Sequence, residues 1–333
     1  MKTKKIVFTE PCVAELLEVD IPEISDNEVL IETEYTVISG GTERAGIMGM
    51  PNTGKGFPRS IGYCGIGKVL KKGSAVSSVS VGDRVLIYHG CHTKHNIRTE
   101  KDITKVCDAS IPSLDAAFVI IASMGLGGVR RLGVEIGESA MVMGLGLLGI
   151  FSIQFLRLSG AYPIIAADLN PARRELALSL GADYALDPTS PDFTEKVKEI
   201  TGGGVRATVE VTGVSAALKT VLECSARGGR ISLLGCTRVS DCGIDFYSQV
   251  HKPGITLLGA HNMARPQVES YPHHWTHQDD CRAILDLIGA GRIKVAPIVS
   301  RVVSPACARE IYKQLCEDPQ FPMGTVWDWK DIE

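Results

Sequence analysis

The chain has 333 residues, of which 44% are apolar and 22% are charged, with a formal net charge of −3. This composition supplies enough apolar material for more than one buried core and excludes a disordered or collagen-like chain. The small net charge gives no indication of a nucleic-acid binder, which usually carries a basic excess. No apolar stretch approaches the roughly 18 residues that a membrane span requires.

Ten cysteines are scattered along the chain, and no two of them have C-x-x-C spacing. Most of them lie in apolar runs, where a thiol behaves as a small hydrophobic group. The basic N-terminus leads into a strand-like pattern and not into the apolar core of a signal peptide. We therefore expect reduced thiols and a soluble, cytoplasmic protein without a membrane partner.

The first third of the chain has the pattern of a β-rich domain. Runs of β-branched or alternating residues predict strands at 5–8, 29–33 and 67–70, and a turn at 81–85 leads into another strand. Short strands at this spacing are typical of a small barrel or a strongly bent sheet.

Strands alternate with helices from residue 113 onward. The Ala- and Leu-rich stretch at 113–133 predicts one or two helices. The pattern then predicts strands at 139–143, 163–167, 205–211, 230–234 and 255–260, and helices at 147–159, 172–180 and 216–225. This alternation indicates an α/β fold with a parallel, doubly wound sheet.

The tail returns to a mixed pattern, with a helix at 279–288, a strand-like stretch at 295–303 and a helix at 307–315. We expect this tail to fold back onto the first part. The predicted organisation is a β-rich domain made of 1–115 and 276–333, interrupted by a nucleotide-binding domain at 116–275.

A glycine-rich turn lies between the first predicted strand and helix of the second domain. It reads Gly144-Leu145-Gly146-Leu147-Leu148-Gly149, a G-x-G-x-x-G. Gly144 permits a tight turn, Gly146 lets the backbone approach a pyrophosphate, and Gly149 lets the helix pack on the strand. The helix N-terminus then presents free N–H groups to the phosphates.

Asp168 follows nineteen residues after Gly149, at the end of the next predicted strand. A carboxylate there accepts hydrogen bonds from the adenosine ribose hydroxyls and repels a 2′-phosphate, so we expect NAD as cofactor and not NADP. Arg173 is a candidate for the adenosine side of the site. The alternatives are a glycine-rich packing turn with a helix-capping Asp168, and a solvated helix charge at Arg173.

With these residues identified, the chain resembles the medium-chain dehydrogenase/reductase superfamily of zinc-type alcohol dehydrogenases over nearly its whole length. The landmarks are Gly41-Thr42-Glu43, the stretch 62–69 (GYCGIGKV), VGDRV at 81–85, the glycine turn and GGRISLLG at 228–235. The resemblance implies a GroES-like catalytic domain, a Rossmann domain and a homodimer or homotetramer. It also implies cofactor contacts beyond the three glycines, Asp168 and Arg173: Leu147, Leu148, Leu169, Thr212, Gly213, Leu234 and Gly235.

The zinc ligands of that superfamily are missing here. Zinc-dependent members carry Cys-Gly-Thr/Ser-Asp where this chain has Gly40 to Glu43, and Gly-His-Glu where it has Gly62-Tyr63-Cys64. The third ligand region at 118–123 has no Cys, His, Asp or Glu, and the four-cysteine structural lobe is absent from the sequence. Since a catalytic zinc needs three protein ligands, we expect no metal at this site. An improvised set from Cys64, Glu43 and a histidine stays open.

The stretch 39–43, the phrase from Tyr271 to Trp275 and Met323-Gly324 resemble a Gly-Thr-Glu subgroup that includes guloside 3-dehydrogenase-type sugar enzymes. This likeness implies oxidation of a secondary alcohol, or reduction of a ketone, on a polyol, sugar, glycoside or cyclitol. Without zinc, a side chain or a hydrogen-bonded relay must take the alcohol proton.

Three residues are the candidates for that proton transfer. Thr42 matches the relay hydroxyl of the family, with a turn residue bonded to its own backbone as the alternative. Tyr63 occupies a zinc-ligand position, and a phenol near a cationic nicotinamide would have a lowered pKa; the alternative is a packing tyrosine. Glu43 is expected to orient the site or to act as a structural carboxylate.

The expected substrate residues come from three parts of the chain. In a strand, His92 and His95 would point to opposite faces, which disfavours a metal site there. A polar and aromatic cluster follows the last predicted strand of the second domain, and it suits either a sugar or a subunit interface. The expected substrate contacts are Ser39, His89, His92, Arg265, Tyr271, His274 and Trp275, with His273 in the same cluster.

Two further functions compete with an NAD-dependent polyol or sugar dehydrogenase. One is a zinc-free quinone or enoyl reductase, which Asp168 opposes because that group mostly uses NADPH. The other is a non-catalytic NAD-binding protein, which the retained hydroxyl of Thr42 and the polar cluster oppose.

Overall fold

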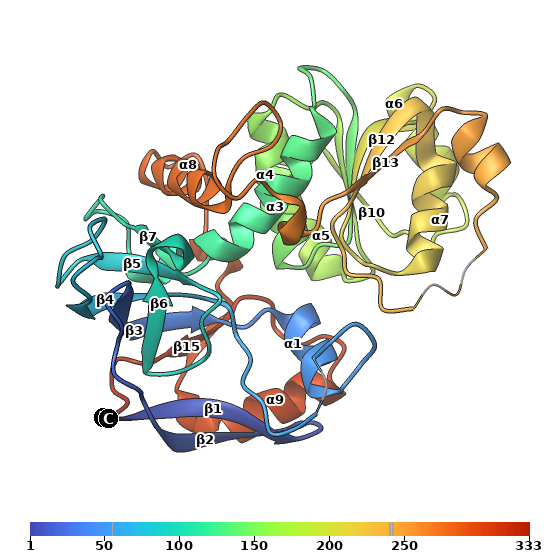
Figure 1. Ribbon diagram of the computed structural model, residues 1–333. Helices are drawn as coiled ribbons and strands as arrows, with labels where there is room; N and C mark the ends of the chain where they lie inside the picture. Colours follow the sequence, from blue (N-terminus) through green and yellow to red (C-terminus); the bar gives the residue numbers. More distant parts are fainter. Residues whose placement is uncertain (55, 240, 242) are drawn as a thin grey trace. The chain divides into compact units, whose positions relative to one another are not determined.

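The computed structural model describes residues 1–54, 56–239, 241 and 243–333. The chain divides into two compact units, which are described separately below (Figure 1). Unit 1 comprises Met1–Ile121 and Cys281–Glu333, and unit 2 comprises Ala122–Asp280. The predicted boundaries fall at 115/116 and 275/276. Both observed boundaries lie inside helices, α3 (Val119–Leu132) and α8 (His277–Gly289), so no turn signal marks them in the sequence.

Unit 1 is built mainly on antiparallel strands, with one parallel pair, β14 and β15. Its larger sheet has the order β14-β15-β3-β4-β5-β7, with β6 also pairing with β3, and β1 and β2 form a separate two-stranded ribbon. The strands are β1 (Lys2–Glu10), β2 (Val13–Asp20), β3 (Glu28–Val37), β4 (Cys64–Lys72), β5 (Arg84–Tyr88), β6 (His95–Thr99), β7 (Ile103–Lys105), β14 (Arg301–Val303) and β15 (Thr325–Asp328). The helices are α1 (Gly40–Ile47), α2 (Ser113–Ala116) and α9 (Ala308–Glu317), besides α8.

The two ends of the chain share one core in unit 1. Phe8 of β1 packs edge-on against Tyr312 of α9, with ring centroids 4.7 Å apart, and Trp327 and Trp329 near the C-terminus are fully buried in the same cluster. Burying these large rings removes much apolar surface from water, which stabilises the association of the two distant segments. The predicted return of the tail onto the first part is therefore observed.

One helix of unit 1 lies where no element is predicted, and one local expectation is wrong. Residues 40–47 form α1. The stretch 295–303 is not one strand: Ala296–Ile298 form a 3-10 turn and the short β14 follows. Pro297 lies inside that turn and has no N–H for a strand ladder, which explains the interruption.

Cys12 and Cys316 form a disulfide between the β1–β2 turn and the end of α9. The expectation that every thiol is reduced is wrong for this pair. Since disulfides are uncommon in cytosolic proteins, the predicted cytoplasmic location loses the support of reduced thiols. Seven described cysteines are free, and Cys242 lies outside the described residues.

Unit 2 contains the predicted parallel, doubly wound sheet. All its neighbouring strands are parallel, in the order β10-β9-β8-β11-β12-β13. Its strands are β8 (Ala140–Met143), β9 (Ile164–Ala167), β10 (Tyr184–Leu186), β11 (Val205–Glu210), β12 (Ser225–Leu233) and β13 (Thr256–Gly259). Its helices are α4 (Leu147–Leu158), α5 (Pro171–Ser179), α6 (Phe193–Thr201) and α7 (Ser215–Cys224), besides α3. This is the strand order of a dinucleotide-binding fold.

The central strands of unit 2 are buried on both faces. Every residue of β8 and of β9 is buried, which is why both read as continuous apolar runs in the sequence. The carboxyl ends of β8, β9, β11 and β12 therefore meet at one edge of the sheet.

Within the described parts of the chain, no helix has the length and apolar character needed to cross a membrane.

Candidate functional site

The predicted glycine turn connects β8 to α4 at the carboxyl edge of the parallel sheet. Gly144 has a φ of +95°, which glycine adopts readily, and a Cβ there would lie 2.9 Å from the Thr212 methyl group. A Cβ on Gly149 would collide with the Gly144 carbonyl oxygen. A Cβ on Gly146 would meet nothing within 4 Å, so the backbone there borders open space. Each glycine thus has the geometry that a pyrophosphate-binding turn requires.

Asp168 joins this turn to the end of β9. Its carboxylate accepts the Leu145 N–H at 2.7 Å and the Asn170 N–H at 2.8 Å, one on each oxygen. A carboxylate oxygen has two lone pairs, so each oxygen keeps one for a further donor such as a ribose hydroxyl. Asn170 then caps α5 by accepting the backbone N–H groups of Ala172 and Arg173.

Glu210 lies at the end of β11, at the carboxyl edge of the parallel sheet, and is not among the predicted site residues. The buried carboxylate accepts the N–H groups of Thr212 at 2.8 Å and Gly213 at 3.1 Å, and also the Thr212 hydroxyl. Burial raises the pKa of Glu210, while these hydrogen bonds oppose that shift. The carboxylate therefore fixes the loop that packs on Gly144. The only sequence signal was an acidic residue that ends an apolar strand.

The other predicted cofactor residues lie on these same loops. Leu147 and Leu148 begin α4, and Leu234 and Gly235 follow β12. Leu169 is exposed beside Asp168, and Arg173 is partly buried in the first turn of α5. Unit 2 therefore has the open glycine turn, the uncapped α4 N-terminus and the carboxylate that a nicotinamide dinucleotide needs.

Three hydroxyl groups meet at the start of α1 in unit 1. The Tyr63 phenol donates to Ser39 Oγ at 2.5 Å, and the Thr42 side chain is also hydrogen-bonded to Tyr63. Ser39 is the N-cap residue of α1, but its hydroxyl makes no capping bond and instead accepts the phenol. Thr42 is exposed in the first turn of α1. We call Ser39, Thr42 and Tyr63 the hydroxyl triad.

The protein environment alone does not lower the pKa of Tyr63. Burial raises the pKa of Tyr63, and the nearby Cys64 and Glu43 add to the rise, whereas the hydrogen bonds with Ser39 and Thr42 oppose it. Tyr63 is therefore a neutral phenol in this unit at ordinary pH. The expected lowering would have to come from the positive charge of a nicotinamide.

Glu43 lies behind the hydroxyl triad, in the core of unit 1. Its carboxylate is fully buried and accepts from the Ser39 N–H at 2.8 Å and the Tyr312 hydroxyl at 2.6 Å. His92 Nε2 lies 3.1 Å from the same carboxylate, and His92 Nδ1 lies 2.8 Å from the Thr36 hydroxyl. Glu43 therefore holds the N-terminus of α1 in place, which agrees with the structural alternative.

The two histidines expected near the substrate differ in environment. His92 is 0% exposed, so it is a core residue, and the expectation that it contacts substrate is wrong for this structure. Gly62, with a φ of +110°, packs directly on His92, where a Cβ would lie 2.8 Å from the His92 backbone nitrogen. His89 is half-exposed, stacks on Tyr88 and lies 3.1 Å from Asp102. His89 remains accessible to a ligand.

The residues at the family's zinc positions offer few metal-binding groups. Cys64 is buried, its thiol donates to the Val37 carbonyl, and burial raises its pKa, which disfavours the thiolate that binds metal. Among the residues that the structure describes, no three His, Cys, Asp or Glu side chains group together as metal ligands would. A catalytic zinc does not fit this donor set.

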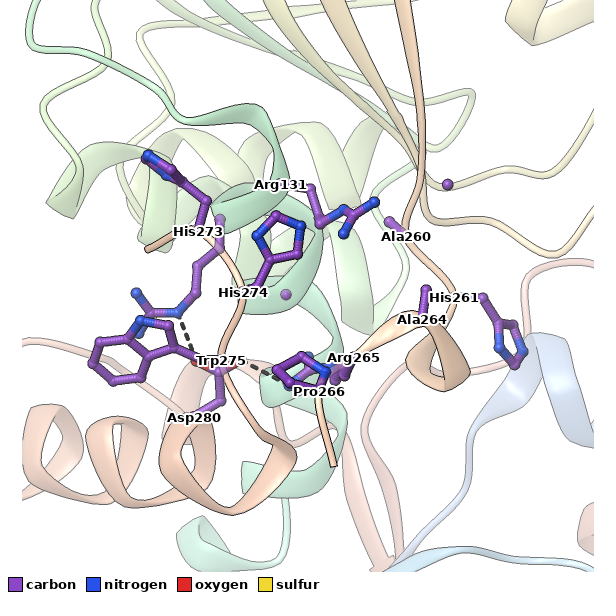
Figure 2. Close-up of a pocket in the computed structure, with 13 residues that line it drawn as sticks. Arg131, Ala260, His261, Ala264, Arg265, Pro266, His273, His274, Trp275 and Asp280 are labelled. Atoms are coloured by element: carbon purple, nitrogen blue, oxygen red, sulfur yellow. Dashed lines mark hydrogen bonds and ion pairs between the residues drawn. The ribbon is translucent and has the colours of Figure 1, made fainter. Parts of the chain in front are cut away.

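The predicted polar and aromatic cluster forms a pocket in unit 2 (Figure 2). Arg265, His273, His274 and Trp275 line it, whereas Tyr271 stacks on His274 with ring centroids 4.7 Å apart. The pocket also contains three residues that the sequence pattern does not indicate, Arg130, Arg131 and Asp280. They belong to α3 and α8, whose helical periodicity gave no sign of this contact.

Several of these side chains already bind one another. Asp280 pairs with Arg130 Nε at 2.6 Å and with Arg265 Nη1 at 2.7 Å, and Arg265 also donates to the Ser123 carbonyl. The Arg130 guanidinium lies 3.7 Å from the centre of the Trp275 ring, so it covers one face of that ring. Arg265 and Trp275 are therefore partly occupied by contacts within the protein.

Two protein families match this chain. Residues 25–134 match the family described as alcohol dehydrogenase GroES-like domain, and residues 148–289 match the family described as zinc-binding dehydrogenase. An L-threonine 3-dehydrogenase of Pyrococcus abyssi is 28% identical over 335 residues, covering 90% of this chain and 91% of that protein. A D-guloside 3-dehydrogenase of Escherichia coli is 26% identical over 348 residues, covering 97% of this chain and 98% of that protein.

Solved structures share the fold at lower sequence identity. A zinc-binding dehydrogenase from Sinorhizobium meliloti, solved with NADP bound, superposes with a TM-score of 0.82 at 21% identity. The match covers 98% of this chain and 99% of that one. At this identity the likeness concerns the fold, and the cofactor named there belongs to that protein.

Proposed function

We propose the function of this chain from one premise: it belongs to the zinc-type alcohol dehydrogenase-like group of the medium-chain dehydrogenase/reductase superfamily, and it is an oxidoreductase. We propose that it interconverts a secondary alcohol and a ketone on a polyol, sugar, glycoside or cyclitol, with NAD as cofactor and without a catalytic zinc. The observation that carries this proposal is the hydroxyl triad, in which Tyr63 occupies a zinc-ligand position and is hydrogen-bonded to Ser39 and Thr42.

NAD is favoured over NADP by the carboxylate of Asp168. The Asp168 carboxylate lies beside the backbone of the glycine turn, where it accepts the Leu145 N–H. An ionised carboxylate that accepts ribose hydroxyls repels a 2′-phosphate. Gly146 and the N-terminus of α4 would hold the pyrophosphate, since a Cβ at Gly146 would enter open space and α4 has no side-chain cap.

The bound nicotinamide supplies a hydride acceptor at one carbon of its ring. The remaining task is the alcohol proton, which we assign to the hydroxyl triad. A hydroxyl group is both a donor and an acceptor, so adjacent hydroxyls pass a proton by shifting their hydrogen bonds. Thr42 is the exposed member: its hydroxyl would accept the substrate proton and release its own proton to water, while Tyr63 and Ser39 form the inner pair that hydrogen-bonds to it.

Tyr63 has a second role that follows from its neutral state. Because burial raises its pKa, the phenol keeps its proton at ordinary pH. In ketone reduction it can donate that proton or a hydrogen bond toward the carbonyl oxygen, which is general acid catalysis. Glu43 acts through position alone, since its carboxylate is enclosed by Ser39, His92 and Tyr312.

The substrate class rests on two features. The relatives include an enzyme named for the oxidation of a guloside, and the unit 2 pocket offers guanidinium and imidazole groups that suit hydroxylated ligands. Ser39 and His89 of unit 1 are also proposed substrate contacts, and a homodimer or homotetramer is the proposed assembly.

The experiment is a screen of polyols, glycosides and inositols with NAD, following NADH absorbance. We expect NADH formation with at least one hydroxylated substrate and little or none with simple quinones or enones. Reduction of quinones or enones by NADPH would instead identify a reductase. NADH binding without turnover of any compound would favour a non-catalytic protein.

A further inference from the structure

The unit 2 pocket carries more positive charge than its own carboxylate can balance. Three arginines line it, Arg130, Arg131 and Arg265, and Asp280 is the sole carboxylate among its described lining residues. Asp280 is 1% exposed and pairs with both Arg130 and Arg265. Dashed lines in Figure 2 mark these two ion pairs. Even with neutral histidines, the pocket retains an excess of two positive charges.

Arg131 is the arginine without a counterion. It has no ion pair or hydrogen bond with the described residues, and its Nε is buried without an acceptor. Leaving a buried donor of a charged group unsatisfied is costly, and such groups are normally paired. Figure 2 shows its guanidinium extending from α3 toward the side of the pocket where Ala260 lies. The side chain therefore presents a planar set of donors to the pocket.

Two histidines add directed ring nitrogens to the same pocket. His261 Nδ1 accepts the Met263 N–H at 3.1 Å, so in the neutral ring Nε2 carries the hydrogen and is a donor. His274 Nδ1 lies 3.2 Å from the Pro272 carbonyl, so Nδ1 donates and Nε2 is the ring nitrogen left for a ligand.

We propose that this pocket binds an oxyanion, a phosphate or carboxylate group, against Arg131. A guanidinium presents parallel N–H groups that match two oxygens of a phosphate or carboxylate, and bound oxygens would satisfy the orphaned donor. The group is either a free small anion or the acidic substituent of a sugar or polyol. The same pocket supports the substrate class proposed above, so where the oxyanion belongs to a sugar or polyol this proposal rests on the proposed function.

Calorimetric titration of the full-length protein with inorganic phosphate tests the proposal. The ionic strength is held constant with chloride, and NADH is kept saturating because phosphate can also bind at the N-terminus of α4. We expect one phosphate per chain with a Kd of about 1 mM. Arg131→Gln should weaken that binding at least tenfold, and Arg131→Lys, which keeps the charge but loses the planar donors, at least threefold.

Arg292→Gln is the matched control, because it removes the same charge from an exposed side chain in unit 1. Binding by this variant should equal that of the unmodified protein. The proposal is wrong if the protein binds no phosphate at about 10 mM, or if Arg131→Gln and Arg292→Gln bind it equally. It is also wrong if Arg131→Gln changes the oligomeric state in sedimentation without changing phosphate binding. In that case Arg131 contacts a second copy of this chain and not an oxyanion.

A second set of titrations separates the two sources of the oxyanion. Glycerol 1-phosphate and glycerol are compared in the unmodified protein and in Arg131→Gln. Tighter binding of the phosphorylated compound than of inorganic phosphate, lost in the variant, identifies an acidic substituent on a larger ligand. Equal binding of both phosphates identifies a free anion. Either result supports the proposal. The proposed dehydrogenase activity is tested separately, by the screen for NADH formation.

Discussion

At the scale of single residues, this chain has a glycine and a tyrosine at two positions where its zinc-dependent relatives are expected to carry metal ligands. Gly40 offers no ligand atom, and Tyr63 offers a phenol that donates to Ser39 at 2.5 Å. A phenol raised in pKa by burial is a poor base but a competent donor. The chemistry assigned to Tyr63 therefore depends on its proton and on its contact with Thr42.

Tyr63→Phe removes the phenol and keeps the ring. We expect turnover to fall about 10²–10⁴-fold, since that is the usual contribution of a positioned acid or base, while the affinity for NADH is unchanged. Thr42→Val should lower turnover less, because water can replace one hydroxyl of a relay. The measurements are steady-state kinetics on a confirmed substrate and NADH binding by fluorescence.

Tyr162→Phe is the control, since Tyr162 is 60% exposed and belongs to unit 2. Near-normal turnover by Tyr63→Phe would make the phenol a packing group. His89 would then be the better candidate, because His92 is buried. A rate profile with an inflection near pH 6.5, the reference value for histidine, would support that assignment.

Asp168 should determine cofactor choice. We expect the unmodified protein to bind NADH at least tenfold more tightly than NADPH, a difference of about 1.4 kcal/mol. Asp168→Ala should narrow this gap, because the repulsion of a 2′-phosphate is lost. Glu175→Ala, an exposed carboxylate on α5, is the control and should leave the ratio unchanged. Equal binding of both cofactors by the unmodified protein would refute the assignment.

At the scale of elements, α1 is held in place by α9 and by the β1–β2 turn. Tyr312 of α9 donates to Glu43, and Arg44 donates to the Cys316 carbonyl at 3.0 Å. The Cys12 N–H donates to the Ile47 carbonyl at 3.1 Å, and Cys12 is bonded to Cys316. The helix that carries Thr42 thus depends on residues at both ends of the chain.

Alkaline pH should destabilise this arrangement through Tyr312. Burial, with added repulsion from Glu43, raises its pKa well above the usual value of about 10. Above pH 10 the unfolded chain loses this proton while the folded chain keeps it, so the free energy of unfolding falls as pH rises. Between pH 8 and pH 10.5, Tyr312→Phe should reduce the fall in the free energy of unfolding by about 0.8 kcal/mol, since the full slope of about 1.4 kcal/mol per pH unit is reached only well above pH 10. Urea unfolding at pH 8 and pH 10.5 measures it, and equal slopes would contradict the argument.

Reduction of the disulfide should weaken unit 1. Closing a long loop restricts the unfolded chain, and natural disulfides contribute about 2–4 kcal/mol. We expect Cys12→Ser to unfold at lower urea concentration, followed by the fluorescence of Trp327 and Trp329, which are both buried in unit 1. Cys307→Ser, which changes an exposed free thiol, is the control. Equal midpoints for Cys12→Ser and the unmodified protein would exclude a stabilising role.

The elements that local patterns specify could be predicted from the sequence, and those that depend on distant contacts could not. The turn from Gly144 to Gly149 has a local requirement for glycine, so the sequence identifies it. By contrast, α1 begins with Gly40 and Gly41, which are poor helix formers, and is stabilised by Tyr312 and Arg44 contacts. Only the folded chain reveals such support.

At the scale of the whole molecule, the structure divides into a discontinuous unit and an inserted unit. The division falls inside α3 and α8, where the helical pattern is unbroken, and so differs from the 115/116 and 275/276 that the sequence predicts. The partners of Glu43 were unpredictable for a related reason. His92 and Tyr312 lie 49 and 269 residues away, and no local pattern links residues at such separations.

We propose above all that this dehydrogenase moves the alcohol proton with hydroxyl groups and without a catalytic zinc. The most direct measurement is zinc content by elemental analysis, taken on the same chelator-dialysed sample that is assayed for NAD-dependent turnover of a confirmed polyol or sugar substrate. The account predicts well under one zinc per chain with turnover retained. One tightly held zinc per chain, lost together with turnover when it is removed, would contradict it and would direct attention to Cys64, Glu43 and a histidine.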